Sequence, residues 1–295
     1  MPDEKTTRSA ALTELTLIFA AVFWGANYAV TKYTAEFLPP ILIVTFRFAV
    51  GGALLLAVLR LFEPESRLRR SEVLAMAALG CFGMAAAQTS FTFGVSMTSA
   101  TNTGLVFATA PIWGLLLGFA LGLERPTWTG MAGIFLSISG IVAVFYDGIG
   151  DEAASFAGDV LVLVAAAAVG CYTVFSMPML ERHTPLAVAT YPTAFGAPFV
   201  LIFALPQLPA FDFGGVGPGA WLGVAYSAVL ATAFTFAAWQ VGISRIGANR
   251  VLVYQYLITL TGVASGIIFF DESLGWNKIL GGAVILVGIY LARRK

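Results

Sequence analysis

Eleven polar or aromatic side chains stand inside long apolar stretches of this 295-residue sequence, and they are its main candidates for chemistry. Rings can stack on a flat solute or hold a cation over a face, and amides can bind both ammonium and carboxylate groups. Buried amides and phenols cost free energy unless they are hydrogen-bonded, so we expect them to face other helices or a wet cavity. We predict that ten of them line a substrate-binding cavity, with plain helix contact as the alternative for each: Trp24, Asn27, Tyr28, Gln88, Asn102, Tyr172, Trp239, Gln240, Tyr254 and Gln255.

The eleventh is Arg47, about eight residues into the second apolar stretch and roughly 12 Å from its outer end at ~1.5 Å per residue. Two interpretations remain open. The side chain extends outward to reach water, or it binds a substrate carboxylate at the outer mouth of the cavity. Its counterpart in the second half of the chain is Pro192, so the charge occurs once.

The titratable residues argue against catalysis. The only histidine, His183, is expected to be solvated in a loop, and Glu14, Glu72 and Asp159 fall at the ends of apolar stretches. Glu272 follows a stretch, where it can satisfy amides at a helix start. Intramembrane metalloproteases need paired histidine and acidic ligands, and a nucleotide-binding loop would need Gly-x-x-x-x-Gly-Lys. We therefore predict no enzyme, no catalytic residue, no metal and no cofactor.

Composition requires a membrane to position these residues. The chain is 59% hydrophobic and 11% charged, whereas soluble domains carry about 25% charged residues. A helix that crosses the ~30 Å hydrocarbon core needs roughly 20 apolar residues, which leaves room for about ten such helices. The net charge is zero, which gives no reason to expect a nucleic-acid partner. No obligate protein partner is evident, and the partners expected are a small-molecule substrate and the lipid bilayer.

The predicted fold is all-α and polytopic, with ten transmembrane helices. Their apolar runs are continuous, which excludes the period-two alternation of a β-barrel. No cleavable signal peptide is expected, because the first run is as long as those that follow. The runs cover residues 13–31, 39–62, 72–94, 99–122, 127–146, 157–180, 185–205, 218–243, 248–270 and 275–292.

Basic residues predict the orientation. If the N-terminus is cytoplasmic, thirteen Lys and Arg residues fall on the cytoplasmic side, while Lys32 and Lys278 fall outside. With Arg47 inside a span, these account for all 16. Both termini are therefore predicted to be cytoplasmic, in a bacterial inner membrane.

The two halves of the sequence resemble each other. Gly94 to Ala100 matches Gly242 to Ala248 at an offset of 148, which also pairs Glu124 with Glu272. Earlier in each half the offset is 145, as for Gly25 and Gly170. We predict two five-helix repeats, residues 1–148 and 149–295. Since five is odd, the second repeat enters the membrane inverted, a common architecture of secondary transporters whose substrate site lies between the repeats.

The sequence resembles the drug/metabolite transporter superfamily, EamA branch. The resemblance rests on Trp24 to Tyr28, on Gly122 to Pro126 with Trp128, and on a second copy at Phe270 to Leu274. It implies ten helices, cytoplasmic termini and export of metabolites or drugs. A narrower similarity, Phe236 to Ile243, is to the bacterial aromatic amino-acid exporters of the YddG type, which also pass viologen-like cations.

The predicted function is secondary transport by alternating access, with export of small amphipathic metabolites, aromatic and neutral amino acids first. The alternatives are an exporter of drugs or organic cations and another EamA metabolite permease. Since proton-coupled carriers use an intramembrane Asp, Glu or His, and the spans hold none away from their ends, facilitated diffusion is expected.

Overall fold

The computed structural model describes residues 4–123, 125, 127–146, 153–247, 251 and 254–292, and these residues contain helices and loops but no strand. The helices are α1 (Glu4–Ala35), α2 (Pro40–Phe62), α3 (Arg70–Ala78), η1 (Leu79–Ala85), α4 (Ala86–Met97), α5 (Ala100–Phe107), α6 (Ala110–Ala120), α7 (Trp128–Tyr146), α8 (Ala153–Leu180), α9 (Pro185–Ala204), η2 (Phe213–Gly215), α10 (Pro218–Ala228), η3 (Val229–Phe234), α11 (Thr235–Ile246), α13 (Tyr254–Phe270) and α14 (Trp276–Ala292).

The polytopic prediction is confirmed. Seven helical runs in the described residues are long and apolar enough to cross a membrane, and three further apolar helices are shorter. Several runs join consecutive elements, as where α3, η1 and α4 together form one run from Arg70 to Met97. The boundary predicted between residues 148 and 149 lies outside the described residues and stays a prediction.

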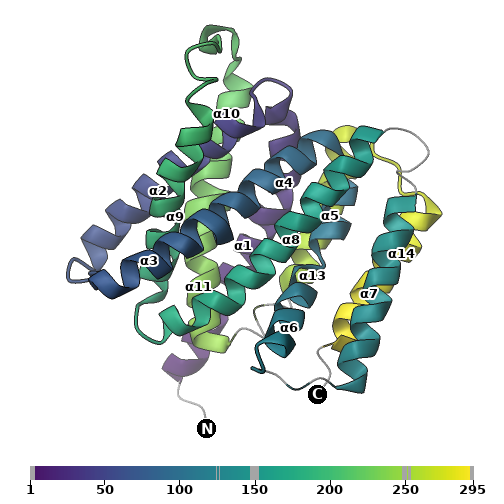
Figure 1. The fold of residues 1–295 in the computed structure, drawn as a ribbon, viewed down its shortest axis with the longest axis horizontal. Helices are drawn as coiled ribbons and strands as arrows, with labels where there is room; N and C mark the ends of the chain where they lie inside the picture. The colour runs from purple at the N-terminus through teal and green to yellow at the C-terminus, as the bar shows by residue number, and fades with distance from the viewer. Residues whose placement is uncertain are drawn as a thin grey trace.

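The helices run between two faces of the molecule (Figure 1). We call the face where α1 begins and α14 ends the terminal face, at the bottom of Figure 1, and the opposite one the far face. The α2–α3 and α8–α9 connections lie at the terminal face, and the α1–α2 and α9–α10 connections lie at the far face.

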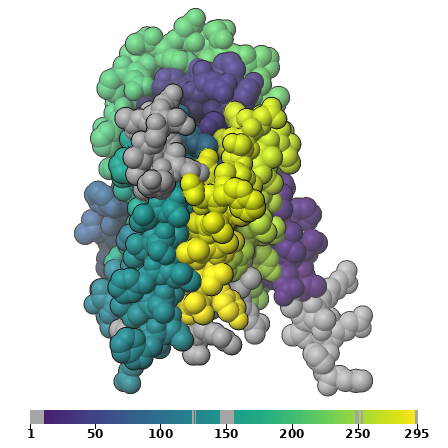
Figure 2. Space-filling view, turned by 90° about the vertical axis from the view of Figure 1, so that its right-hand side faces the viewer, coloured from purple at the N-terminus to yellow at the C-terminus, as the bar shows by residue number. Residues whose placement is uncertain are grey.

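The two halves of the chain interlock. The principal contacts pair α1 with α13, α2 with α9 and α4 with α8, so each pair takes one helix from each half. The last helices of the halves, α7 and α14, pack mainly against each other at one edge, side by side in Figure 2. Their backbones approach closely because Gly133 and Gly288 carry no Cβ, and either Cβ would collide with the opposite helix. The interior is therefore built between the halves, while α7 and α14 stay peripheral.

Each half carries one π-helical segment, η1 in the first and η3 in the second. They occupy equivalent places in the repeats, since an offset of 148 carries residues 79–85 onto 227–233. The segment η1 lies against α9, where Gly80 meets the backbone of Pro192. The segment η3 lies against α2, where Thr232 meets Arg47. Such π-helical turns occur frequently at functional sites.

Candidate functional site

A small cavity lies between the two halves of the molecule. Its volume is about 20 Å³, room for roughly one water molecule. α1 and η1 line it from the first half, and α8 and α11 from the second. Its lining consists of Trp24, Met84, Val169, Tyr172, Thr173, Ser176, Phe236, Trp239, Gln240 and Ile243. In this conformation the side chains have closed around the space, so a solute can enter only if the halves move apart.

Aromatic rings form one wall of the cavity. The Trp24 ring meets Trp239 edge-on at 5.4 Å between centroids, and Phe236 is 5.9 Å from Trp24. Residues 236, 239, 240 and 243 recur at helical spacing, so α11 presents them on one face. Two tryptophans from opposite halves therefore meet where the halves face each other. The ring of a flat solute can take the place of one of them in this contact.

The polar part of the cavity comes from Tyr172 and Gln240. The Gln240 side-chain amide donates to the Tyr172 hydroxyl at 3.2 Å, and that hydroxyl donates to the Val188 carbonyl at 3.4 Å. The Tyr172 ring fits closely because it faces Gly83 of η1, which has no side chain. The Gln240 Oε1 atom is buried and has no partner within the described chain. It is a free acceptor beside the aromatic wall.

The structure thus brings four of the ten predicted residues together in the cavity: Trp24, Tyr172, Trp239 and Gln240. The other six lining residues were not predicted, because they are apolar or small hydroxyl residues that are common along these helices: Met84, Val169, Thr173, Ser176, Phe236 and Ile243. For Phe236, the signal was its helical spacing from Trp239 and Gln240.

Two predicted residues lie one turn beyond the cavity toward the far face. Tyr28 follows Trp24 by four residues, and Gln88 follows Met84 by four, so each shares a helix face with a cavity residue. Both are buried, and neither the Tyr28 hydroxyl nor Gln88 Oε1 has a partner among the described residues.

The other predicted residues lie elsewhere. Asn27 is taken up by contacts between helices, because its amide donates to Thr31 at 3.1 Å and accepts from Ser227 at 2.6 Å. Tyr254 is half-buried at the start of α13. Its neighbour Gln255 is buried, and its side-chain nitrogen has no partner in the described part of the chain.

Arg47 does not reach the surface, so the outward extension considered from the sequence is wrong for this conformation. The side chain is 0% exposed and packs between α2 and η3, where Nε donates to the Thr232 hydroxyl at 3.0 Å. The hydroxyl of Thr232 offered no signal in the sequence, since threonines are frequent along these helices.

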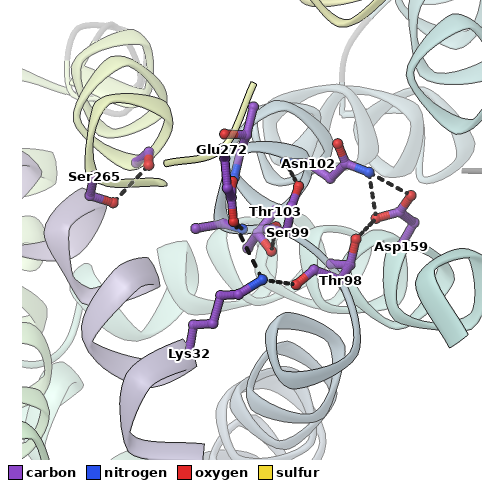
Figure 3. A network of polar contacts seen from close by, with 11 residues as sticks. Lys32, Thr98, Ser99, Asn102, Thr103, Asp159, Ser265 and Glu272 are labelled. Atoms are coloured by element: carbon purple, nitrogen blue, oxygen red, sulfur yellow. Dashed lines mark hydrogen bonds and ion pairs between the residues drawn. The ribbon is translucent and has the colours of Figure 1, made fainter. Parts of the chain in front are cut away.

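A polar network at the far face joins the two halves (Figure 3). We call it the far-face network; its members are Lys32, Thr98 and Asn102 of the first half and Asp159 and Glu272 of the second. Lys32 pairs with Glu272 at 3.3 Å and donates to the Thr98 carbonyl at 2.7 Å. The Thr98 hydroxyl donates to Asp159 at 2.6 Å, and the Asn102 amide donates to the same carboxylate at 3.1 Å. Asn102 therefore belongs to this network rather than to the cavity.

Asp159 and Glu272 accept these bonds in different settings. Asp159 lies six residues into α8 and is 0% exposed, so it is more enclosed than its predicted place at a helix end indicated. Glu272 accepts from the backbone amides of Ala100 and Thr101, both at 2.8 Å, at the start of α5. Burial raises the pKa of Glu272, but the bonds from Thr101 and Ala100 and the charge of Lys32 outweigh it and leave that pKa below its ordinary value. The carboxylate is ionised at neutral pH.

A second set of contacts joins the halves at the terminal face. The ring of His183 lies 3.0 Å from Glu72, Thr184 donates to Glu63, and the Tyr191 hydroxyl donates to the Ser66 carbonyl at 2.9 Å. We call these six residues the terminal-face network. His183 lies in the loop between α8 and α9, as expected, but it is a half-buried contact residue, and its expected solvation is wrong. An open groove of about 800 Å³ borders the network and carries several charged side chains, among them Arg67, Arg69 and Arg182.

Comparison with known proteins places this arrangement in a family. The EamA-like transporter family matches the chain twice, over residues 11–146 and 156–294. An uncharacterized transporter of Archaeoglobus fulgidus is 25% identical over 95% of this chain and 98% of its own. A probable terminal-alkyne amino-acid exporter of Streptantibioticus cattleyicolor is 29% identical over 77% of this chain and 75% of its own. A probable amino-acid metabolite efflux pump of Escherichia coli is 26% identical over 93% and 92%.

A solved crystal structure shares the fold, with a TM-score of 0.65 and 18% identity over 96% of both chains. The double match covers nearly the whole chain, with one matched stretch in each half. The relatives carry the names of transporters and exporters rather than of enzymes. The chain belongs to the EamA-like transporter family and is a multi-pass membrane transporter.

Proposed function

We propose that this transporter exports small amphipathic amino acids, aromatic ones first, by rocking its two halves around the cavity between them. The observation that carries the proposal is the wall formed by Trp24, Phe236 and Trp239. It offers ring surface to an aromatic side chain, while Gln240 offers a free acceptor to a donor on the solute. The names of two relatives, a probable terminal-alkyne amino-acid exporter at 29% identity and a probable amino-acid metabolite efflux pump at 26%, support this substrate class.

The orientation we propose places the terminal face in the cytoplasm of a bacterial cell and the far face outside. It rests on the excess of Lys and Arg in the connections at the terminal face. Single cysteines in place of Arg67 and Asp212, with Cys81 and Cys171 changed to alanine, should react with an impermeant thiol reagent from opposite sides. Labelling of both positions from one side of the membrane contradicts the orientation.

Counterflow of phenylalanine in proteoliposomes tests the substrate class. Trp239→Ala should lower the rate about tenfold, because an aromatic contact and its buried area contribute roughly 1–2 kcal/mol. Trp128 and Trp276 are matched controls, since their side chains are 91% and 76% exposed and lie at the edge formed by α7 and α14. Equal losses for Trp239→Ala and Trp128→Ala at equal expression would count against the cavity as the substrate site.

We further propose facilitated diffusion, in which the solute gradient sets the direction of net transport. The described spans hold one fully buried carboxylate, Asp159, and it is taken up by hydrogen bonds in the far-face network. A pH step of about two units across the liposome membrane should give no accumulation of phenylalanine above equilibrium. Uphill accumulation that a protonophore abolishes would show proton coupling. Asp159→Asn would then be the variant to test for loss of that coupling.

Flat organic cations are a second candidate, favoured by the same tryptophan faces. Inhibition of phenylalanine counterflow by a viologen measures how well such cations compete for the site. Competition that Trp239→Ala removes would place both kinds of solute in one cavity.

A further inference from the structure

Arg47 is the least compensated group in the interior. Its side chain is fully enclosed by protein, and neither Nη1 nor Nη2 has a partner among the described residues. Its one hydrogen bond runs from Nε to a neutral hydroxyl, that of Thr232. Leaving a buried charge unpaired costs several kcal/mol, which an anion placed beside it would recover.

The position of Arg47 relates it to the cavity. Its partner Thr232 precedes the cavity residue Phe236 by four residues, about one helical turn or 6 Å. The guanidinium therefore lies about one turn from the cavity toward the far face. Tyr28 and Gln88 lie one turn from the cavity in the same direction, on α1 and α4, which both pack against α2. They add an unpartnered hydroxyl and an unpartnered amide oxygen at this level.

The internal repeat shows that packing alone does not require an arginine here. The equivalent position in the second half is Pro192, which packs against η1 as Arg47 packs against η3. An apolar residue thus fills the same place between equivalent helices. The charge occurs at this position in the first half and not in the second, and its unpartnered donors need an acceptor.

We infer that Arg47 binds the carboxylate of the transported solute, so that the carrier selects carboxylates, zwitterionic amino acids among them, over bare amines. The inference rests on the proposed function and deepens it. Nη1 and Nη2 form a planar pair that matches the two oxygens of a carboxylate. One helical turn separates this pair from the aromatic wall, a spacing of the order of the distance from ring to carboxylate in an aromatic amino acid. Gln88 Oε1 can accept from the ammonium group.

Three solutes with the same ring test the inference: phenylalanine, 3-phenylpropionate without the ammonium group, and phenethylamine without the carboxylate. In proteoliposomes, phenethylamine should compete with labelled phenylalanine at least about tenfold less well than 3-phenylpropionate does. Arg47→Met should lower phenylalanine counterflow at least about tenfold while phenethylamine flux changes less than twofold, and Arg47→Lys should restore part of the loss. Wild-type rates of phenylalanine transport in folded Arg47→Met would overturn the inference.

Thermal stabilisation of the purified protein separates this inference from the proposed function and guards against a variant that fails to fold. Wild-type protein should be stabilised by 3-phenylpropionate and not by phenethylamine, and Arg47→Lys should need a higher concentration for the same shift. If wild-type protein transports no amino acid but is stabilised by 3-phenylpropionate and not by phenethylamine, the proposed substrate is wrong and the carboxylate-binding role of Arg47 is supported. Equal stabilisation by acid and amine would overturn the role of Arg47.

Discussion

The far-face and terminal-face networks both join the two halves of the molecule, but their surroundings differ. Both cross between the halves, and both set carboxylates against hydroxyl groups and one basic side chain. In the far-face network, Asp159 is fully enclosed and Glu272 holds two backbone amides besides Lys32. In the terminal-face network, the bond between Thr184 and Glu63 is exposed at an open groove, while the His183 and Glu72 side chains are 10% and 7% exposed.

This difference predicts which face opens more easily. Charged hydrogen bonds that water does not reach, such as those of Asp159, are worth more than exposed contacts such as Thr184–Glu63, which contribute about 0–1 kcal/mol each. The far-face network also holds two backbone amides at the start of α5 across the halves, whereas the terminal-face network holds one backbone carbonyl, that of Ser66. In the conformation described, parting the halves at the terminal face therefore costs less free energy than parting them at the far face.

The repeat explains why the two networks are not copies of each other. Residue 183 corresponds to residue 38 at the offset of 145, so leucine on the far face stands where histidine stands on the terminal face. Leu38 belongs to an apolar cluster with Ile43, Ala220 and Val224. Positions that correspond by this offset therefore carry different chemistry at the two faces.

The largest effect is expected from Glu272→Gln. The change removes the ion pair with Lys32 and weakens two bonds to the start of α5, which should destabilise far-face closure by about 2–3 kcal/mol. Spin labels at Ser96 and Ser273, one on each half, should report a longer or broader distance distribution. Glu36→Gln, an exposed acid near the same face, is the matched control. An unchanged distribution would show that the network does not hold the far face closed.

Acidification should have a smaller effect on the same label pair. The pKa of Glu272 is lowered in the closed state, so its contribution is fully present above the ordinary glutamate value of about 4.3 and is lost as pH falls below it. The distance should stay constant between about pH 7 and 5 and lengthen below about 4.3. Glu272→Gln should remove that dependence. A transition centred above pH 5 would point to a different group.

His183→Gln should produce a change of about 1 kcal/mol at the terminal face, because it alters one contact with Glu72 and leaves the Thr184–Glu63 and Tyr191–Ser66 bonds in place. Labels at Arg67 and Glu181, both exposed, report on that face. Their distance should increase while the distance between labels at 96 and 273 stays the same. A loss as large as that of Glu272→Gln would contradict the ranking of the two networks.

Salt should give the smallest effect and sharpen the comparison. At about 1 M salt the screening length falls to roughly 3 Å, which weakens pairs that water reaches and leaves enclosed ones nearly unchanged. The Lys32–Glu272 pair is itself partly exposed, whereas the bonds of Asp159 are enclosed and should persist, so the terminal-face distance should broaden more at high salt than the far-face distance. The reverse response would show that the far-face network is the hydrated one.

The sequence predicts which side chains inside the spans are unusual, but not which residues each of them contacts. Trp239 and Gln240 were singled out because strongly polar or large aromatic residues inside a span need a reason, and both line the cavity. Asn27 and Asn102 met the same criterion, yet they bind Ser227 and Asp159. Periodicity gives the face of a helix but not which neighbour that face meets.

The sequence by itself determined the membrane, the helices and the resemblance between the halves, because apolar runs of spanning length and repeated offsets are properties of the chain alone. Only the tertiary structure decided that Arg47 is enclosed rather than extended to water, and that His183 meets Glu72. Both outcomes depend on contacts between residues more than a hundred positions apart. The interlocking of α2 with η3 and α9, and of α3 with α9, sets those contacts, and no local spacing encodes it.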